Sequence, residues 1–386
     1  MRRPRVPAPE HFGSRLHSAA VAARVGLWLG ICFGVAFLTG LLSHYAQNPS
    51  QPVPFPTSPA WGYRLTQGLH VVAGTAAVPL LLVKLWTVYP RFLRRPARGV
   101  RRLVLDVLER LSIGVLVAAA VFQLATGLAN SSQWYPWAFS FRATHYAVAW
   151  VAVGALALHV AVKLPVIRTA LTRDVEDPAL DPPTATRGGA LSRRGLLRAT
   201  WAAAGVAVLA TAGSTLPVLR RVSVLGVRSG DGPQGVPINT SAEAAGVLDR
   251  AADPGWRLTV TSGERVVELS LDDLRALPQR TESLPIACVE GWSAGGEWTG
   301  VRLRDLLDLV DAPAGRDVRV ASLQESGPFR ITLLQDGFAD DDRTLVALAL
   351  AGEPLVLDHG FPARLIAPNR PGVLQTKWLA RLEVLA

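Results

Sequence analysis

A single cysteine is the strongest chemical signal in the C-terminal part of the chain. Cys288, in the run Cys-Val-Glu-Gly-Trp, is the only cysteine in the last two-thirds of the 386 residues. The other one, Cys32, lies in an apolar run near the opposite end, and a thiol without a partner cannot form a structural disulfide. Cys288 is therefore a buried inert thiol, a reactive thiolate or a ligand for a soft metal.

Four histidines in the N-terminal part have the spacing of metal ligands. His145 and His159 are 14 residues apart, which in a helix places them within ~40° of one face and about 21 Å apart along the axis. Neutral imidazole is the axial ligand of b-type haem, and an ionisable group inside a bilayer indicates function. His70 matches His145 in depth and His17 matches His159, which predicts two haems. A helix-end histidine that only forms hydrogen bonds at the interface is the alternative.

These histidines lie in or beside long uncharged segments. Each segment is long enough, at ~1.5 Å per residue, to cross a hydrocarbon core of about 30 Å. The runs without Asp, Glu, Lys or Arg are 25–43, 65–83, 143–162 and 199–219, together with 111–141, which includes a loop and an uncharged helix. The sequence therefore predicts five transmembrane helices in a lipid bilayer.

The arginines predict the orientation of these helices. They cluster before the first helix, between the second and third, and after the fourth; the clusters are Arg2, Arg3, Arg5, Arg15 and Arg24, then Arg91, Arg94, Arg95, Arg98, Arg101 and Arg102, then Arg168, Arg173, Arg187, Arg193, Arg194 and Arg198. By the positive-inside rule the N-terminus is cytoplasmic and everything after about residue 220 is extracytoplasmic. Arg220 and Arg221 then lie on the side that the rule disfavours.

Charge placement also decides what the net charge means. A formal net charge of +10 and a pI near 10.5 would suggest nucleic acid in a soluble protein. Here the positive charge flanks membrane segments, so we expect no nucleic-acid partner.

The start of the fifth apolar segment has the form of an export signal. Leu191-Ser192-Arg193-Arg194-Gly195-Leu196-Leu197 is similar to a twin-arginine signal, although paired arginines before a membrane helix are also ordinary positive-inside charge. Ala210-Thr211-Ala212 has the small residues of a cleavage site, and we favour an uncut anchor. Residues 174–190, rich in Asp, Pro, Thr and Gly, are predicted to be a linker.

Residues 236–386 resemble the molybdenum-cofactor domain of the sulfite oxidase family, which includes a periplasmic methionine sulfoxide reductase catalytic subunit. The resemblance rests on three runs in order, CVEGWSAGGEWTGVRLRDLL, SLQESGPFR and DHGFPARLIAPNRPGVLQTKW. It implies a molybdopterin cofactor with Cys288 as the protein thiolate on molybdenum. It also implies that His359, Arg364 and Lys377 hold the pterin and its phosphate. Ser322 is either a further cofactor contact or a strand residue with local hydrogen bonds.

Residues 14–165 resemble the four-helix, two-haem cytochrome b subunits of respiratory formate dehydrogenases. The likeness rests on the placement of the histidines and implies haem b and a quinone or quinol partner. His44, at the end of the first segment, is an alternative ligand, part of a quinone site or an interfacial residue. No dinucleotide-binding glycine motif, Walker loop or iron–sulfur cysteine cluster is present in the sequence, so electrons are expected to move through haem.

Together these features predict an all-α transmembrane bundle followed by an α+β domain. The expected divisions are 1–170 for the cytochrome-like bundle, 171–221 for the linker and fifth helix, and 222–386 for the extracytoplasmic oxidoreductase domain. In that domain, strands are expected at 257–260, 318–323, 329–334 and 365–367, and helices at 271–276 and 303–310.

The predicted activity is oxygen-atom transfer at molybdenum, coupled to quinone through the haems, with a sulfoxide-like small molecule or protein-bound oxide as the substrate. A sulfite-type dehydrogenase that passes electrons to quinone is the first alternative. A non-catalytic cytochrome b with a degenerate sensing domain is the second.

Overall fold

The computed structural model describes residues 12–93, 99–185, 191–226 and 232–386. Arg2, Arg3, Arg5, Arg94, Arg95, Arg98 and Arg187, which contribute to the predicted orientation, lie outside these ranges. The chain divides into two compact units, the first formed by residues 1–38 and 69–212 and the second by residues 39–68 and 213–386. The division from sequence assigns residues 39–68 to the bundle, whereas in the structure they cluster with the C-terminal domain.

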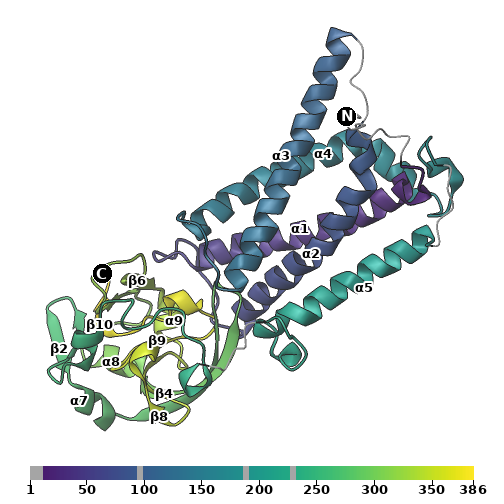
Figure 1. Ribbon diagram of the computed structural model, residues 1–386. Coiled ribbons are helices and arrows are strands. Elements are labelled where there is room, and N and C mark those ends of the chain that lie inside the picture. The colour runs from purple at the N-terminus through teal and green to yellow at the C-terminus, as the bar shows by residue number, and fades with distance from the viewer. Residues whose placement is uncertain (1–11, 94–98, 186–190, 227–231) are drawn as a thin grey trace, which may run out of the picture. The chain divides into compact units, whose positions relative to one another are not determined.

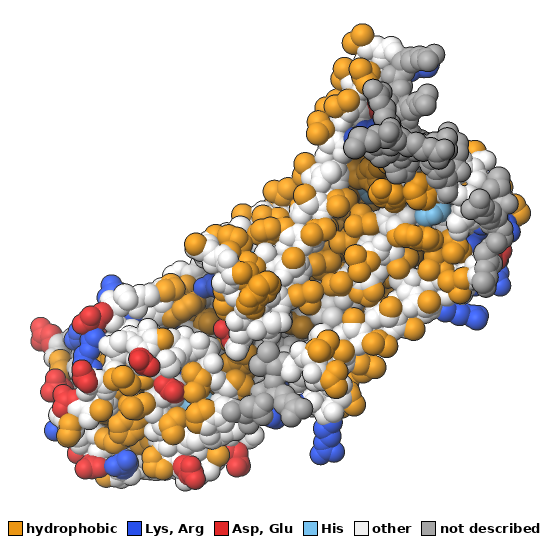
Figure 2. Space-filling view, viewed as in Figure 1, with side chains coloured by type: hydrophobic (Ala, Val, Ile, Leu, Met, Phe, Trp, Pro, Cys, Tyr) orange, Lys and Arg blue, Asp and Glu red, His pale blue; other side chains and the backbone are white. Residues whose placement is uncertain are grey.

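Five long apolar helices confirm the predicted membrane segments (Figure 1). They are α1 (Ala19–Ala46), α2 (Gly62–Phe92), α3 (Val100–Ser131), α4 (Phe141–Thr172) and α5 (Arg193–Thr211). Figure 2 shows that hydrophobic side chains cover most of the visible surface of these helices. A helix satisfies its own backbone hydrogen bonds, which makes it suitable for a bilayer.

The fifth helix begins within the predicted Leu191–Leu197 motif but ends before the apolar run does. Ser192 caps it, because its side chain accepts a hydrogen bond from the N–H of Gly195 at 3.0 Å. The helix therefore begins at Arg193 and ends at Thr211, eight residues before the apolar run does. Pro217, which has no N–H, lies in the part of the run that is not α-helical.

The second unit contains two five-stranded sheets with short helices, which confirms the α+β prediction. One sheet has the order β2-β1-β10-β5-β6, and in the other β3-β4-β7-β8 form the path while β9 also pairs with β7. Among the strands of the described residues, only β1 and β10 pair in parallel. The strands are β1 (Leu258–Ser262), β2 (Arg265–Leu269), β3 (Gln279–Ala287), β4 (Ser293–Arg302), β5 (Val318–Ser322), β6 (Ile331–Leu334), β7 (Leu345–Leu350), β8 (Glu353–Pro354), β9 (Arg364–Ile366) and β10 (Leu379–Val384). The helices are α6 (Leu248–Ala252), α7 (Leu271–Ala276), α8 (Leu303–Asp308) and α9 (Asp336–Ala339).

Aliphatic residues of both sheets form the core of this unit. Leu258, Val320, Val346 and Leu382 are all fully buried in one cluster that also includes residues of α8. A second cluster contains Cys288. The strand ends beside these clusters are therefore held in place by packing on both sides.

The loop between α1 and α2 is part of the second unit. The carbonyl of Pro49 accepts a hydrogen bond from the N–H of Leu333 at 2.7 Å, next to strand β6. The Nη1 of Arg370, a residue that is 1% exposed, donates to Oε1 of Gln51 at 2.8 Å. The other Arg370 nitrogens donate to the carbonyls of Leu374 and Leu333. The loop thus completes the hydrogen bonding of a buried guanidinium.

We expect Gln51→Ala to destabilise the second unit by about 1–3 kcal/mol, because it leaves a buried charged donor of Arg370 without its acceptor. The matched control is Ser50→Ala, since Ser50 is exposed and its side chain bonds only to neighbouring Asn48. Urea unfolding of the detergent-solubilised chain, followed by tryptophan fluorescence, measures the difference. Equal midpoints for the two variants would contradict this role for Gln51.

Candidate active site

A tight turn between β3 and β4 presents Cys288. The N–H of Cys288 donates to the carbonyl of Trp292 at 2.9 Å, and the N–H of Gly291 donates to the carbonyl of Cys288 at 3.0 Å. Gly291 has φ 86°, a conformation that glycine adopts without strain. Oε2 of Glu290 accepts from the indole Nε1 of Trp292 at 3.0 Å and lies 3.9 Å from Sγ of Cys288. The thiol is thereby fixed at the end of a strand pair.

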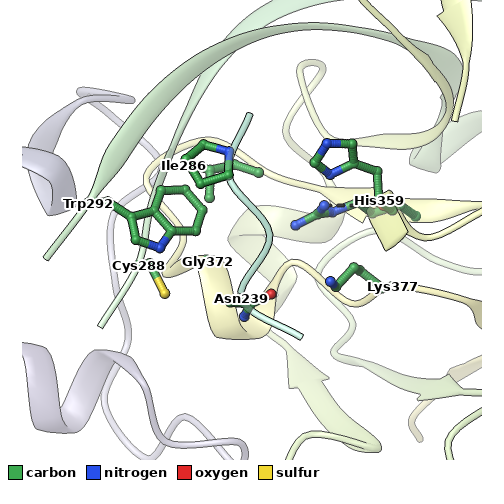
Figure 3. Close-up of a pocket in the computed structure, with 9 residues that line it drawn as sticks. Asn239, Ile286, Cys288, Trp292, His359, Gly372 and Lys377 are labelled. Carbon is green, nitrogen blue, oxygen red and sulfur yellow. Dashed lines mark hydrogen bonds between the residues drawn. The ribbon is translucent and has the colours of Figure 1, made fainter. Parts of the chain in front are cut away.

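Figure 3 shows Cys288 facing a pocket that three predicted residues also line. His359 ends a 3-10 turn, Arg364 begins β9, and Lys377 comes two residues before β10. The remaining lining residues are Pro237, Asn239, Ile286, Trp292 and Gly372. The structure therefore brings together four residues that are up to 89 positions apart in the sequence.

A close backbone approach joins two of these elements. Gly360 has φ 108°, and a Cβ there would lie 3.0 Å from Cβ of Lys377. Lys377 in turn donates from Nζ to the carbonyls of Thr240, at 2.6 Å, and Asp358, at 2.9 Å. Because residue 360 is glycine, the turn that ends at His359 can approach the backbone of Lys377 closely.

Burial makes the charged forms of these side chains costly. It lowers the pKa of Lys377 to about 7, with Arg364 adding to the shift, and it lowers the pKa of Arg364 to about 9. Burial also lowers the pKa of His359 to about 4, so this imidazole is neutral at pH 7. The pKa of the Cys288 thiol is raised to about 12, first by burial and then by Glu290. A thiolate here needs a cation or metal to stabilise it.

The pocket has the polarity of an anion site. Nε of Arg364 is buried and has no hydrogen-bond partner in the described part of the chain, while its Nη1 donates to the carbonyl of His359 at 3.2 Å. The lining residues that the structure describes include no Asp or Glu. An anionic ligand would satisfy the orphaned donor and restore the favoured charge on Arg364 and Lys377.

The structure also places Ser322, for which the sequence left two alternatives open, and Asn239. Ser322 is absent from the described lining: its Oγ donates to the carbonyl of Lys377 at 2.8 Å and accepts from the N–H of Gln324 at 3.3 Å, which is the local arrangement of the two considered. Asn239 lines the pocket but was not predicted. It carries no charge and lies outside any helix or strand, so only its place near the start of the resembling region could have indicated it.

Comparison with known proteins identifies the domain that contains this pocket. Residues 245–386 match the family described as oxidoreductase molybdopterin binding domain. The matched residues include β1 to β10 and four of the residues that line the pocket's charged side and thiol, Cys288, His359, Arg364 and Lys377. A putative protein-methionine-sulfoxide reductase subunit, YedZ1, of Azospira oryzae is 33% identical over 115 residues, which are 30% of this chain and 43% of that protein. Sulfite oxidase of Arabidopsis thaliana is 31% identical over 153 residues, 31% of this chain and 39% of the relative.

A solved structure of the sulfane dehydrogenase SoxCD from Paracoccus pantotrophus matches with 24% identity and a TM-score of 0.31, covering 34% of this chain and 38% of that one. The chain thus spans less than half the length of each of these three proteins. The matched family and both sequence relatives are oxidoreductases, which indicates the same class of chemistry for residues 245–386.

The pocket of the molybdopterin domain suits its cofactor, an anionic pterin that carries a phosphate and a dithiolene. Among the described residues no group of three or more His, Cys, Asp or Glu side chains could hold a metal ion. A metal beside Cys288 would therefore depend on ligands that arrive with it, as the dithiolene does. Arg364 and Lys377 supply the cations that a phosphate group requires.

The first predicted histidine pair meets within the helical unit. The ring centroids of His70 and His145 are 6.3 Å apart, with ring planes at 65°. Nδ1 of His70 lies 2.9 Å from the carbonyl of Ala36, which can only accept, so the proton is on Nδ1. The hydroxyl of Thr126 donates to the carbonyl of Phe122 at 2.7 Å, so its oxygen accepts from Nδ1 of His145 at 3.2 Å. Both rings therefore carry their lone pair on Nε2.

The second predicted pair is not joined by any ring contact in the described residues. The ring of His17 lies against Trp86 with centroids 4.4 Å apart and ring planes tilted by 36°, and its Nδ1 lies 3.3 Å from the carbonyl of Thr87. His159 is half-buried on α4 and has Lys84, Lys163 and Glu109 as charged neighbours. The structure thus gives these two histidines different surroundings.

We expect the cofactor-free protein to gain stability between pH 7 and pH 9 because of Lys377. Its pKa is about 7 in the folded protein against an ordinary value of 10.5, so in this window the unfolded chain binds more protons and unfolding becomes less favourable as pH rises. Lys377→Met should remove the contribution of Lys377 to the rise of stability with pH. The measurement is the melting temperature of both proteins at the two pH values, in material produced without molybdate. Identical slopes would show that Lys377 does not carry the effect.

Proposed function

We propose that the protein is a membrane-bound molybdenum enzyme that transfers oxygen atoms and exchanges electrons with quinone through b-type haem. The observation that carries this proposal is that Cys288 shares a pocket with the buried guanidinium of Arg364, whose Nε has no partner among the described residues, in a domain that matches the molybdopterin family. We assign Cys288 as the molybdenum ligand and His359, Arg364, Lys377 and Asn239 as residues that hold the pterin. Ser322 would act indirectly, by fixing the carbonyl of Lys377.

The favoured reaction is reduction of a sulfoxide, in which R₂SO, two protons and two electrons give R₂S and water. A quinol supplies the electrons and becomes quinone with release of two protons. The bound molybdenum supplies the oxygen-atom acceptor. The protein side chains bind and orient the cofactor, and neutral His359 donates from Nε2 to the carbonyl of Pro233 at 2.7 Å, which leaves Nδ1 as a hydrogen-bond acceptor.

A sulfite-type dehydrogenase is the second candidate, because the similarity to sulfite oxidase of Arabidopsis thaliana is of the same strength as that to the methionine-sulfoxide reductase subunit. In that direction sulfite and water give sulfate, two protons and two electrons, and quinone is reduced. Membranes assayed with methionine sulfoxide and a quinol, and separately with sulfite and a quinone, distinguish the two.

The proposal includes a haem between His70 and His145. Two metal–nitrogen bonds of about 2 Å, plus about 1 Å from each nitrogen to its ring centre, give a centroid separation of about 6 Å, close to that observed. Ligating histidines normally donate their other N–H to a carbonyl or similar acceptor, as both of these do. A second haem between His17 and His159 stays a prediction, and it would require His17 to leave Trp86.

We also propose that the molybdopterin domain is exported folded by a twin-arginine route and that the N-terminus is cytoplasmic. The positive-inside distribution of arginine supports this orientation. Arg193 is 1% exposed, donates to the carbonyls of Val175 and Asp177 and pairs with Asp181, so changing it disturbs the folded linker as well. Arg194, whose side chain is 57% exposed, is the position at which substitution by lysine tests the signal itself.

We expect Cys288→Ser to abolish activity while the domain still folds, because the change replaces the protein thiolate by a hydroxyl of nearly the same size. Cys32→Ser, which alters a thiol in α1, is the matched control and should stay active. Assays of sulfoxide reduction are compared with the melting temperature of each variant. An active Cys288→Ser enzyme would rule out the assigned ligand.

Thr126 should tune the haem at His145. The hydrogen bond from Nδ1 of His145 to Thr126 makes the imidazole a better electron donor and so stabilises oxidised iron. We therefore expect Thr126→Val to raise the midpoint potential of the haem by about 20–65 mV, which corresponds to the loss of a hydrogen bond of about 0.5–1.5 kcal/mol. Thr126→Ser keeps the hydroxyl and should match the wild type. Potentiometric titration of the haem absorption band measures the shift. If His145→Ala retained the full haem content, this site would be wrong.

A further inference from the structure

An apolar and basic turn follows the fifth membrane helix. Residues 217–225, here called the hook, form successive tight turns in which the N–H of Arg220 donates to the carbonyl of Pro217 and the N–H of Ser223 to that of Leu219. At Gly213 a Cβ would lie 2.5 Å from Cβ of Ser223, so the hook folds back against the residues that end the helical segment. The hook therefore has a defined backbone.

The outward side chains of the hook are mostly large and aliphatic. Val218 is 85% exposed, Val222 54%, Val224 81% and Leu225 73%. Neighbouring exposed apolar side chains of this kind mark an interaction site on a folded protein. Arg220 and Arg221 are exposed between them and form no ion pair with any described residue.

Two connections place the hook at the end of membrane-spanning segments. The candidate span that contains α5 runs to Ser214, three residues before the hook begins. The neighbouring Leu216 packs on Gly68, where a Cβ would be 3.2 Å from its Cδ2, and Gly68 lies six residues inside α2. At about 1.5 Å per residue, Gly68 is about 9 Å along the axis from the start of α2, which is a second candidate span. The hook is thus at the depth of a membrane interface.

We propose that the hook is a membrane-surface anchor that inserts Val218, Val224 and Leu225 among lipid acyl chains and pairs Arg220 and Arg221 with anionic headgroups. Aliphatic residues beside arginines are the composition of segments that lie in the interface. The proposal accounts for the two arginines that the positive-inside rule disfavours, because headgroup phosphates stabilise them on either side of a membrane. It does not depend on the redox reaction.

The anchor has a consequence for the pocket. Thr215, two residues before the hook, donates from Oγ1 to the carbonyl of Gly291 in the Cys288 turn. Lipid contact at the hook would therefore hold the molybdopterin site at a fixed height above the membrane, which limits the substrates that can approach it.

The test uses the full chain in a Cys32→Ser background, with Val224→Cys labelled by an environment-sensitive fluorophore and reconstituted into phosphatidylcholine vesicles with and without phosphatidylglycerol. Val266→Cys, on the edge strand β2 and 57% exposed in the native chain, is the matched control. Brominated lipid should quench the label at 224 several-fold more than at 266. Val218→Cys should behave like Val224→Cys and serves if the latter does not fold.

The basic residues are tested in the same system. Arg220→Gln combined with Arg221→Gln should remove the increase in quenching that phosphatidylglycerol produces. Equal quenching at 224 and 266 would overturn the proposal. So would a signal at 224 that changes only with the amount of protein per vesicle, since that result indicates contact with a second copy of the chain.

Discussion

The molybdopterin pocket depends on positive charge that the chain buries without a matching carboxylate in the described lining. Arg364 and Lys377 both have pKa values pulled down by burial, and one donor of Arg364 has no partner among the described residues. Burying such charges is costly, and an anion that pairs with them offsets this cost. The cofactor phosphate would do so, and the thiolate of Cys288 would be stabilised by the same cations and by the metal. The free energy of cofactor binding therefore contributes directly to the stability of the pocket.

The loop between two membrane helices also helps to stabilise buried positive charge in this domain. Arg370 is a third buried cation, and its pKa is lowered to about 9 by burial. All three nitrogens of the Arg370 guanidinium have hydrogen-bond acceptors, one of which is Gln51, whereas Nε of Arg364 has none among the described residues. Asn369, next to it, accepts from the N–H of Tyr63 at 2.5 Å and donates to the carbonyl of Pro56 at 2.7 Å. The segment that leads to Gly372 in the pocket is therefore held by residues from the N-terminal part of the chain.

The sequence predicted the features that local pattern or motif encodes. The five apolar helices and the helix at 271–276 are present, and the motif residues Cys288, His359, Arg364 and Lys377 share one pocket. It did not predict β3 and β4, whose alternation is broken by glycine and proline, or the role of Gln51, whose only signal is a tertiary contact 319 residues away. Asn239 and Thr126 escaped for the same reason, since each acts through a partner that no sequence spacing specifies.

The central claim is that this chain carries molybdenum at Cys288 in the pocket described. Elemental analysis of the full-length protein, purified from membranes by a tag and washed free of loose metal, tests it most directly. We expect one molybdenum atom per chain, and we expect denaturation to release one phosphorylated pterin per chain. A folded protein that retains haem but contains neither molybdenum nor pterin, when made in cells that supply both, would contradict the account.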